Sequence, residues 1–304
     1  MGELVALLSA ACFAAANVTI VRGTGGRSSE NGAFLSILVT ALLSAIAMLL
    51  FHPPHGHHVL DLRGALWFAL SGVLTIFVGR VFLYASVQHL GAVRASAVKR
   101  LNPVFSVILG VTLMGETMNL PMIAGMLLIF GSFGLLAMQA WRSRPAVRAS
   151  NDRGNSLRDL GNLGYLYGPV SALAYATGYL ARKQGLIAMP DPNFGTLIGA
   201  VAGAVTFVLT SFFIESYATA VKSTFGRINP WLLAAAVMSS LGQILQFVAL
   251  NYSTISRVAL ITSMEVIVTM LLSMWLLRSY ERMSRATAVA AAMSVAGAML
   301  VIRG

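Results

Sequence analysis

The sequence has little cysteine and little charge, and each shortage excludes a class of protein. Its one cysteine, Cys12, permits neither an intrachain disulfide nor a metal site built from cysteines. Charged residues make up 10% of the chain, whereas water-soluble domains carry roughly 25%. Hydrophobic residues occupy 57% of the 304 positions. This composition is typical of an integral membrane protein and excludes an ordinary soluble domain.

Acidic residues are also scarce, since 10 Asp and Glu stand against 21 Lys and Arg, for a net charge of +11. In a soluble protein this excess would indicate a nucleic-acid partner. Here the basic residues punctuate apolar segments instead of lining one polar face, so we interpret them as topology and substrate charges. The first apolar segment begins with Glu3 and lacks a basic leader, which favours a retained helix over a cleaved signal peptide.

Ten apolar segments are long enough to cross a bilayer. A hydrocarbon core of roughly 30 Å needs about 20 apolar helical residues, because the backbone in lipid must satisfy its own hydrogen bonds. The segments are residues 4–21, 32–51, 64–87, 93–114, 120–140, 165–180, 194–214, 231–250, 258–277 and 286–302. The sequence therefore predicts an all-α integral membrane protein with ten transmembrane helices.

The ten segments fall into two related halves, 1–140 and 163–304, joined by a polar, arginine-rich linker at 141–162. Sliding one half over the other by about 162 to 165 positions places Ser9 on Ser171 and Gly79 on Gly242. Because five helices are an odd number, two such halves must cross the membrane in opposite senses. This inverted repeat is a transporter architecture.

The strongest local motif, residues 91–106, reads GAVRASAVKRLNPVFS and is followed by Gly115 and Glu116. It resembles the fourth helix of the drug/metabolite transporter superfamily, EamA type, which shows small residues, a central proline and a terminal Gly-Glu. The resemblance implies a ten-helix transporter of two inverted repeats. Lys99, four residues before the proline, and the following Phe-Ser are also similar to plastid sugar-phosphate translocators of that superfamily.

The second half departs from this pattern. Glu265 and Val266 stand where the first half has Asn102 and Pro103, and Tyr280 replaces the glycine of the Gly-Glu pair. The departure predicts that the two halves play unequal parts in the mechanism.

Ionisable side chains inside the spans are the leading candidates for a substrate site. Each costs on the order of 2.5 to 3.5 kcal/mol on insertion scales, so it should face a cavity or a partner. Arg80, Lys99, Arg100 and Glu265 lie within the predicted spans. Lys99 and Arg100 point about 100° apart on a helix, which makes one face of the fourth helix basic. A basic cavity attracts anions, so the predicted substrate carries a carboxylate or a phosphate.

A helix kink and three tyrosines complete the predicted site. Pro103 removes a backbone hydrogen bond, so the fourth helix should kink at Asn102 and Pro103, and transporter sites favour such breaks. Tyr84, Tyr175 and Tyr179 are candidates to pack against the organic part of a substrate.

Alternatives stay open for these side chains. Lys99 and Arg100 would either contact the ligand or form a structural salt bridge with Glu265. Glu265 would neutralise a basic residue, carry a proton or bind a substrate amine. Arg257 lies close to a span end and is expected to extend into the interface. Glu116 and its counterpart Glu281 are expected to cap the helices that follow them and to stay outside the site.

No metal site, cofactor or catalytic residue is predicted. Residues 52–58 carry four histidines and precede Asp61, but their spacing matches no structural zinc site, so a solvated loop is expected. The absence of a nucleotide-binding motif argues against direct use of ATP. The spans hold no histidine and one carboxylate, which argues against an intramembrane enzyme.

Loop charges predict an orientation. Twelve Lys and Arg fall in the loops that follow odd-numbered spans, and four, namely Arg63, Arg182, Lys183 and Arg303, fall in the even-numbered loops and at the C-terminus. The positive-inside rule then places both termini outside, opposite to what the resemblance implies for many family members. The expected location is a bacterial inner (plasma) membrane.

Together these features predict a secondary transporter with a cationic site near the midplane, bounded by helices three, four, eight and nine. It would move a small anionic or zwitterionic metabolite by alternating access. Its partners would be that small molecule and the lipid bilayer, with no nucleic acid, and a monomer would suffice. The alternatives are an amino-acid or drug exporter with an aromatic-lined cavity, and a lipid flippase.

Overall fold

The computed structural model describes residues 1–24, 32–51, 61–79, 82, 101–142, 157–226, 229–276 and 285–304. Nearly all of these residues are helical, and no strand occurs among them. The all-α fold class is therefore confirmed.

Helices of the first half follow the apolar runs of the sequence. They are α1 (Gly2–Thr24), α2 (Ala33–Phe51), α3 (Leu62–Gly72), the π-helical segment η1 (Val73–Val78), α6 (Asn102–Met114) and α7 (Leu120–Arg142). Asp61 caps α3 by accepting a hydrogen bond from the Arg63 amide at 2.9 Å. α3 continues directly into η1. π-helical turns are rare in proteins, and those that occur are often found at functional sites.

The second half contains longer helices, several with polar caps. They are α8 (Leu157–Ala188), α9 (Pro192–Ser211), α10 (Glu215–Thr224), α11 (Pro230–Tyr252), α12 (Ile255–Thr262), α13 (Glu265–Leu276) and α14 (Arg285–Arg303). Asp191 and Asn229 cap α9 and α11. Each precedes a proline in the first turn, where a backbone amide would have no partner within the helix, so its absence costs no hydrogen bond.

Among the described residues, five segments are long and apolar enough to cross a membrane: Gly2–Ile20, Ala33–Leu50, Pro192–Ser211, Pro230–Tyr252 and Ile255–Leu272. Four shorter apolar segments accompany them, namely Leu62–Val78, Asn102–Met114, Leu120–Leu136 and Ala288–Arg303. The helical content and the apolar surface both fit a protein that sits in a bilayer.

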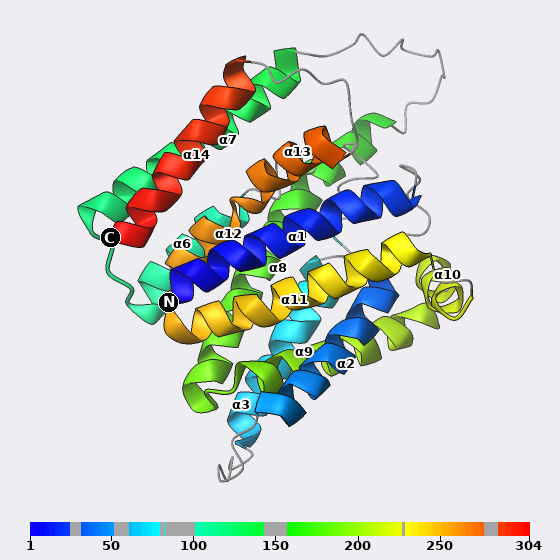
Figure 1. The fold of residues 1–304 in the computed structure, drawn as a ribbon. Helices are drawn as coiled ribbons and strands as arrows, with labels where there is room; N and C mark the ends of the chain where they lie inside the picture. The colour runs from blue at the N-terminus through cyan, green and yellow to red at the C-terminus, as the bar shows by residue number, and fades with distance from the viewer. Residues whose placement is uncertain are drawn as a thin grey trace.

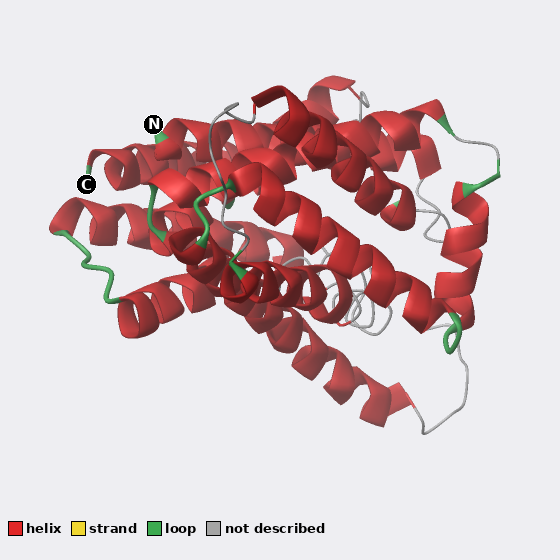
Figure 2. Ribbon diagram, turned by 90° about the horizontal axis from the view of Figure 1, so that it is seen from below, coloured by secondary structure: helices red, strands yellow, loops and turns green. Residues whose placement is uncertain are grey.

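The helices form one bundle in which each half packs against the other (Figure 1). α1 lies antiparallel to α11, with Gly2 beside Ser253 and Gly23 beside Trp231. Likewise α3 packs on α8, α2 on α9, α6 on α12 and α7 on α14. Both chain ends lie at the same end of the bundle, here named the terminal end (Figures 1 and 2). The opposite end, where α1 finishes and α2 and α11 begin, is named the far end.

Small residues let these helices approach closely. A Cβ atom on Gly125 would lie 2.5 Å from the Gly297 carbonyl oxygen, so only glycine fits between α7 and α14. Ser132 and Ser294 share a hydrogen bond of 2.5 Å at the same seam. Ala10 and Ala14 are fully buried in α1.

Three predicted boundaries differ in the structure. The sixth span continues to Ala188, so Arg182 and Lys183 belong to α8 and the prediction of loop residues there was wrong. The ninth span is broken at residues 263–264, between α12 and α13. Helices α7 and α8 also extend into the predicted linker, through Arg142 and from Leu157.

Candidate central cavity

A cavity of about 600 Å³ lies inside the bundle. Its walls come from α1, α2, α3, η1, α6, α7, α8, α9, α11, α12 and α13, more elements than the four helices predicted from sequence. Small-molecule sites usually enclose roughly 300 to 1,000 Å³, so the cavity suits a metabolite-sized ligand.

Arg182 supplies the positive charge of the described cavity wall. It is 2% exposed and donates to three neutral oxygens: Gln246 Oε1 at 2.6 Å, Ser71 Oγ at 3.1 Å and Thr75 Oγ1 at 3.3 Å. Within the part of the chain that the structure describes, no carboxylate lies within ion-pair distance of it. The guanidinium is thus solvated by the protein but keeps its net charge.

Aromatic rings border this guanidinium on two sides. Its central carbon lies 4.6 Å from the centre of the Phe247 ring and 5.5 Å from that of Tyr179. The Tyr179 hydroxyl accepts a hydrogen bond of 2.9 Å from Gln246, the same side chain that accepts from Arg182. These contacts fix the direction of the cation and offset part of its burial cost.

The local backbone explains why Arg182 finds these partners. Ser71 ends α3 and Thr75 lies in η1, and both line the cavity. The hydroxyl of Thr75 is positioned by its bond to the Ser71 carbonyl at 2.8 Å. The last turn of α3 and the π-helical segment therefore present one hydroxyl each toward α8.

Glu265 supplies the negative charge of the described wall and begins α13, just after the break at residues 263–264. Its Oε1 accepts a hydrogen bond of 2.7 Å from Asn17 of α1. Among the described residues, no cation lies within ion-pair distance of Glu265. The described wall thus holds one cation and one anion, from different helices, and no described side chain neutralises either.

The cavity reaches the far end of the bundle. Gly32 and Leu232, at the beginnings of α2 and α11, belong to its lining, as does Ile20 near the end of α1. Toward the terminal end, the lining comes no nearer than Phe13 on α1 and Phe247 on α11. The described lining of the cavity therefore extends closer to the far end than to the terminal end.

Comparison with protein families gives a match in two parts, residues 1–138 and 162–303, to the model of the EamA-like transporter family. The chain belongs to the EamA-like transporter family. It is thus a membrane transporter of the drug/metabolite type, as the sequence resemblance implied. No curated protein sequence matches the chain.

Solved structures share the fold of this EamA-like transporter. One, described as "Crystal structure of protein", matches with a TM-score of 0.70 at 16% sequence identity, over 98% of this chain and 95% of its own. At that identity the likeness shows the fold alone.

Five residues of the predicted EamA-like site line the cavity: Tyr175, Tyr179, Glu265, Asn102 and Pro103. Asn102 and Pro103 form the first turn of α6, where proline is well tolerated. The other four predicted residues, Arg80, Tyr84, Lys99 and Arg100, lie outside the described residues, as do the histidines of residues 52–58.

The sequence interpretation missed Arg182, because the sixth apolar run was ended at residue 180. A signal was present nonetheless, since Tyr175, Tyr179 and Arg182 follow the spacing i, i+4, i+7 of a single helix face. Extending that face by one turn would have placed the arginine beside the two tyrosines.

Glu116 was also misassigned. The helix that follows it, α7, is capped by Asn119, whose side-chain oxygen accepts from the Met122 amide at 3.1 Å. Glu116 instead accepts from the amides of Ile255 and Ser256, at 2.5 and 3.0 Å, and so caps α12 of the other half.

Proposed function

We propose that this EamA-like protein is a secondary transporter that moves a small anionic or zwitterionic metabolite by alternating access through the central cavity. The observation that carries the proposal is Arg182, a buried cation that faces the cavity with only neutral partners among the described residues. A buried charge without a counter-ion costs free energy, and a bound anionic ligand would lower that cost by supplying the opposite charge.

Two hydrogen bonds support an organisation in two inverted repeats. Ser9 donates to the Gly242 carbonyl at 2.8 Å, and Ser171 donates to the Gly79 carbonyl at 2.5 Å. The serines are 162 positions apart and the glycines 163, which is the offset found between the halves in sequence. The same bond is thus made twice, with the roles of the two halves exchanged.

The seam between α7 and α14 fits the same two-fold relation. Ser132 and Ser294 contact each other and are separated by 162 positions. A residue that touches its own repeat counterpart must lie near the axis that relates the halves. The antiparallel course of α7 and α14 agrees with an axis in the membrane plane.

The charges of the cavity are not repeated between the halves. At the same offsets, Arg182 corresponds to Ile20 and Glu265 corresponds to Asn102. Arg182 is suited to a carboxylate or phosphate, because guanidinium recognises planar and tetrahedral anions through paired donors. No described cation neutralises Glu265, which can therefore accept an ammonium group, and a zwitterion would match both charges. Lys99, Arg100 and Arg80 remain predicted contributors to the site.

The distribution of loop charges supports a cytoplasmic location for the far end of the bundle. The far end joins the loops that hold twelve Lys and Arg, and the placement of Arg182 and Lys183 inside α8 lowers the count for the opposite side from four to two. The positive-inside rule therefore places the far end, and the open cavity, toward the cytoplasm of a bacterial inner membrane.

A thermal-shift screen tests the proposed site. Purified protein in detergent is scanned with carboxylates, amino acids, sugar phosphates and cationic drugs, alongside Arg182→Gln and the matched surface variant Arg63→Gln. The proposal expects anionic or zwitterionic compounds to raise the Tm of the wild type and of Arg63→Gln, but not of Arg182→Gln. Stabilisation by cationic or neutral compounds alone, equal in all three proteins, would refute it.

A further inference from the structure

The terminal end of the bundle is sealed by apolar packing beneath a polar layer. Leu250, Ile255 and Val258 are fully buried there and pack with Ala6 of α1 in one core cluster. The cavity floor, with Phe247 and Ala259 in its lining, lies just inside these residues. A path from the cavity to the terminal end along α1 would therefore separate α1 from the junction of α11 and α12.

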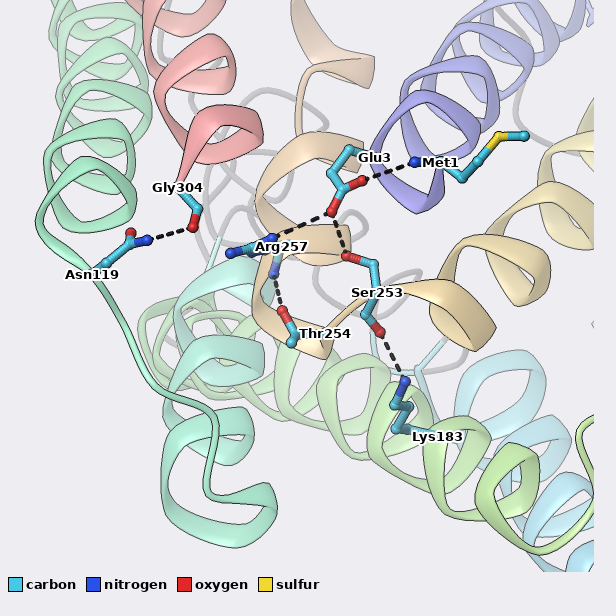
Figure 3. Close-up of polar contacts among 8 residues, drawn as sticks. All are labelled: Met1, Glu3, Asn119, Lys183, Ser253, Thr254, Arg257 and Gly304. Atoms are coloured by element: carbon cyan, nitrogen blue, oxygen red, sulfur yellow. Dashed lines mark hydrogen bonds and ion pairs between the residues drawn. The ribbon is translucent and has the colours of Figure 1, made fainter.

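Charged side chains from three other elements hold that junction. Figure 3 shows two of them, Glu3 of α1 and Lys183 of α8. From α1, Glu3 Oε1 accepts from the Ser253 hydroxyl at 3.1 Å and pairs with the Arg257 guanidinium at 3.4 Å. From α8, Lys183 Nζ donates to the carbonyls of Leu250 and Ser253 at 2.6 and 2.9 Å.

The third contact comes from the segment between α6 and α7. Glu116 accepts from the first two amides of α12, at Ile255 and Ser256, and interacts electrostatically with Lys183. Glu3, Glu116, Lys183 and Arg257 are here named the terminal clamp. Every member either belongs to the α11–α12 junction or binds it. Together the four residues connect α1, α8 and the α6–α7 segment to this junction.

The strength of the clamp suits a reversible contact. The Glu3 and Arg257 side chains are 17% and 28% exposed, so their ion pair is partly screened by solvent. Pairs of this kind are weak, and their loss shifts an equilibrium by roughly fivefold. The clamp can therefore bias a conformational equilibrium without freezing it.

We propose that the terminal clamp is the gate that keeps the terminal end closed while the cavity is open at the far end, and that its release opens the terminal side. This inference rests on the proposed function, because a gate has meaning only in a transporter that alternates between two states.

Two reporter cysteines test the gate in a Cys12→Ala background. Ser256→Cys is fully buried under the clamp, and the Ser256 hydroxyl has no hydrogen-bond partner to lose. Ser239→Cys lines the open cavity. Labelling rates with a water-soluble thiol reagent are measured for both reporters in detergent, with Glu3→Gln, Arg257→Gln, Lys183→Met and the control Arg63→Gln.

The expected result is a rise of about fivefold in labelling at position 256 and a fall at position 239 in the clamp variants, with no change in Arg63→Gln. The double exchange Glu3→Arg with Arg257→Glu should return both rates toward those of the intact clamp. It also separates the loss of the pair from a failure to fold.

Faster labelling at both positions, or at neither, would overturn the gate, because the first indicates unfolding and the second a purely structural clamp. Labelling requires no solute, so either outcome leaves the proposed function standing. Conversely, a wild-type protein that binds no anion or zwitterion would refute the function without altering the labelling result.

Discussion

Arg182 donates a hydrogen bond of 2.6 Å to the side-chain oxygen of Gln246, across the interface between α8 and α11. The side-chain amide of Gln246 in turn donates a hydrogen bond of 2.9 Å to the Tyr179 hydroxyl. Neutral groups thereby orient the guanidinium, and no carboxylate of the described residues neutralises it. Such an arrangement keeps a charge available for a ligand at a cost in stability.

Replacing Arg182 by Gln should separate stability from binding. Removing a buried cation that no described carboxylate neutralises relieves its desolvation cost, so the apo protein is expected to be at least as stable. Binding of carboxylates should weaken by roughly tenfold or more, because a charge-assisted hydrogen bond is lost. Thermal unfolding with and without solute measures both effects. A variant that is less stable and still binds normally would mark Arg182 as structural.

Glu265→Gln tests whether the second charge recognises an ammonium group. The variant keeps a side-chain oxygen for Asn17 but loses the negative charge. Amino-acid zwitterions should bind at least about tenfold more weakly, while simple carboxylates change little. Competition binding measures the ratio, with the exposed Glu215→Gln as control. An equal effect on both classes of solute would assign Glu265 another role.

The α7–α14 seam should tolerate no side chain at Gly125. In Gly125→Ala the new methyl group would meet the Gly297 carbonyl at 2.5 Å, and overpacking of this kind costs about 1 to 3 kcal/mol. Gly134→Ala, on the same helix with no atom within 4 Å of the new Cβ, should leave the Tm unchanged or raise it slightly. If both variants unfold alike, the close seam does not contribute to stability.

Much of the fold was predictable because apolar runs and small residues are local signals. The runs located most helices, and Ser9, Ser171, Gly79 and Gly242 led to the prediction of a repeat before any contact was known. The helix break at residues 263–264 was not predictable, since no proline or glycine marks it. Glu116 was misread for a related reason, because its partners are 139 and 140 positions away.

The candidate site was predictable only in part. Glu265, Tyr175 and Tyr179 attract notice in a sequence because a charge or a hydroxyl inside an apolar run is unusual. Arg182 lies where an apolar run has already ended, and hydropathy alone treats such an arginine as a loop residue. Its burial depends on Ser71, Thr75 and Gln246, which come from other helices.

The proposed orientation of the bundle predicts opposite results for two reporter fusions in a bacterial host. A fusion after Gly304, at the terminal end, should give active alkaline phosphatase and no fluorescence from green fluorescent protein. A fusion after Gly226, at the far end, should give the reverse. Fluorescence from the Gly304 fusion would invert the orientation and make the open cavity face the outside.

Counterflow in proteoliposomes tests the central claim most directly. Vesicles with purified protein are loaded with an unlabelled solute that raised the Tm, and entry of the labelled solute is followed for the wild type, Arg182→Gln and Arg63→Gln. Transport through the cavity predicts transient accumulation for the wild type and Arg63→Gln, and loss of at least about nine-tenths of it for Arg182→Gln. Equal accumulation in all three would contradict a route past Arg182, and accumulation in none would contradict transport of that solute class.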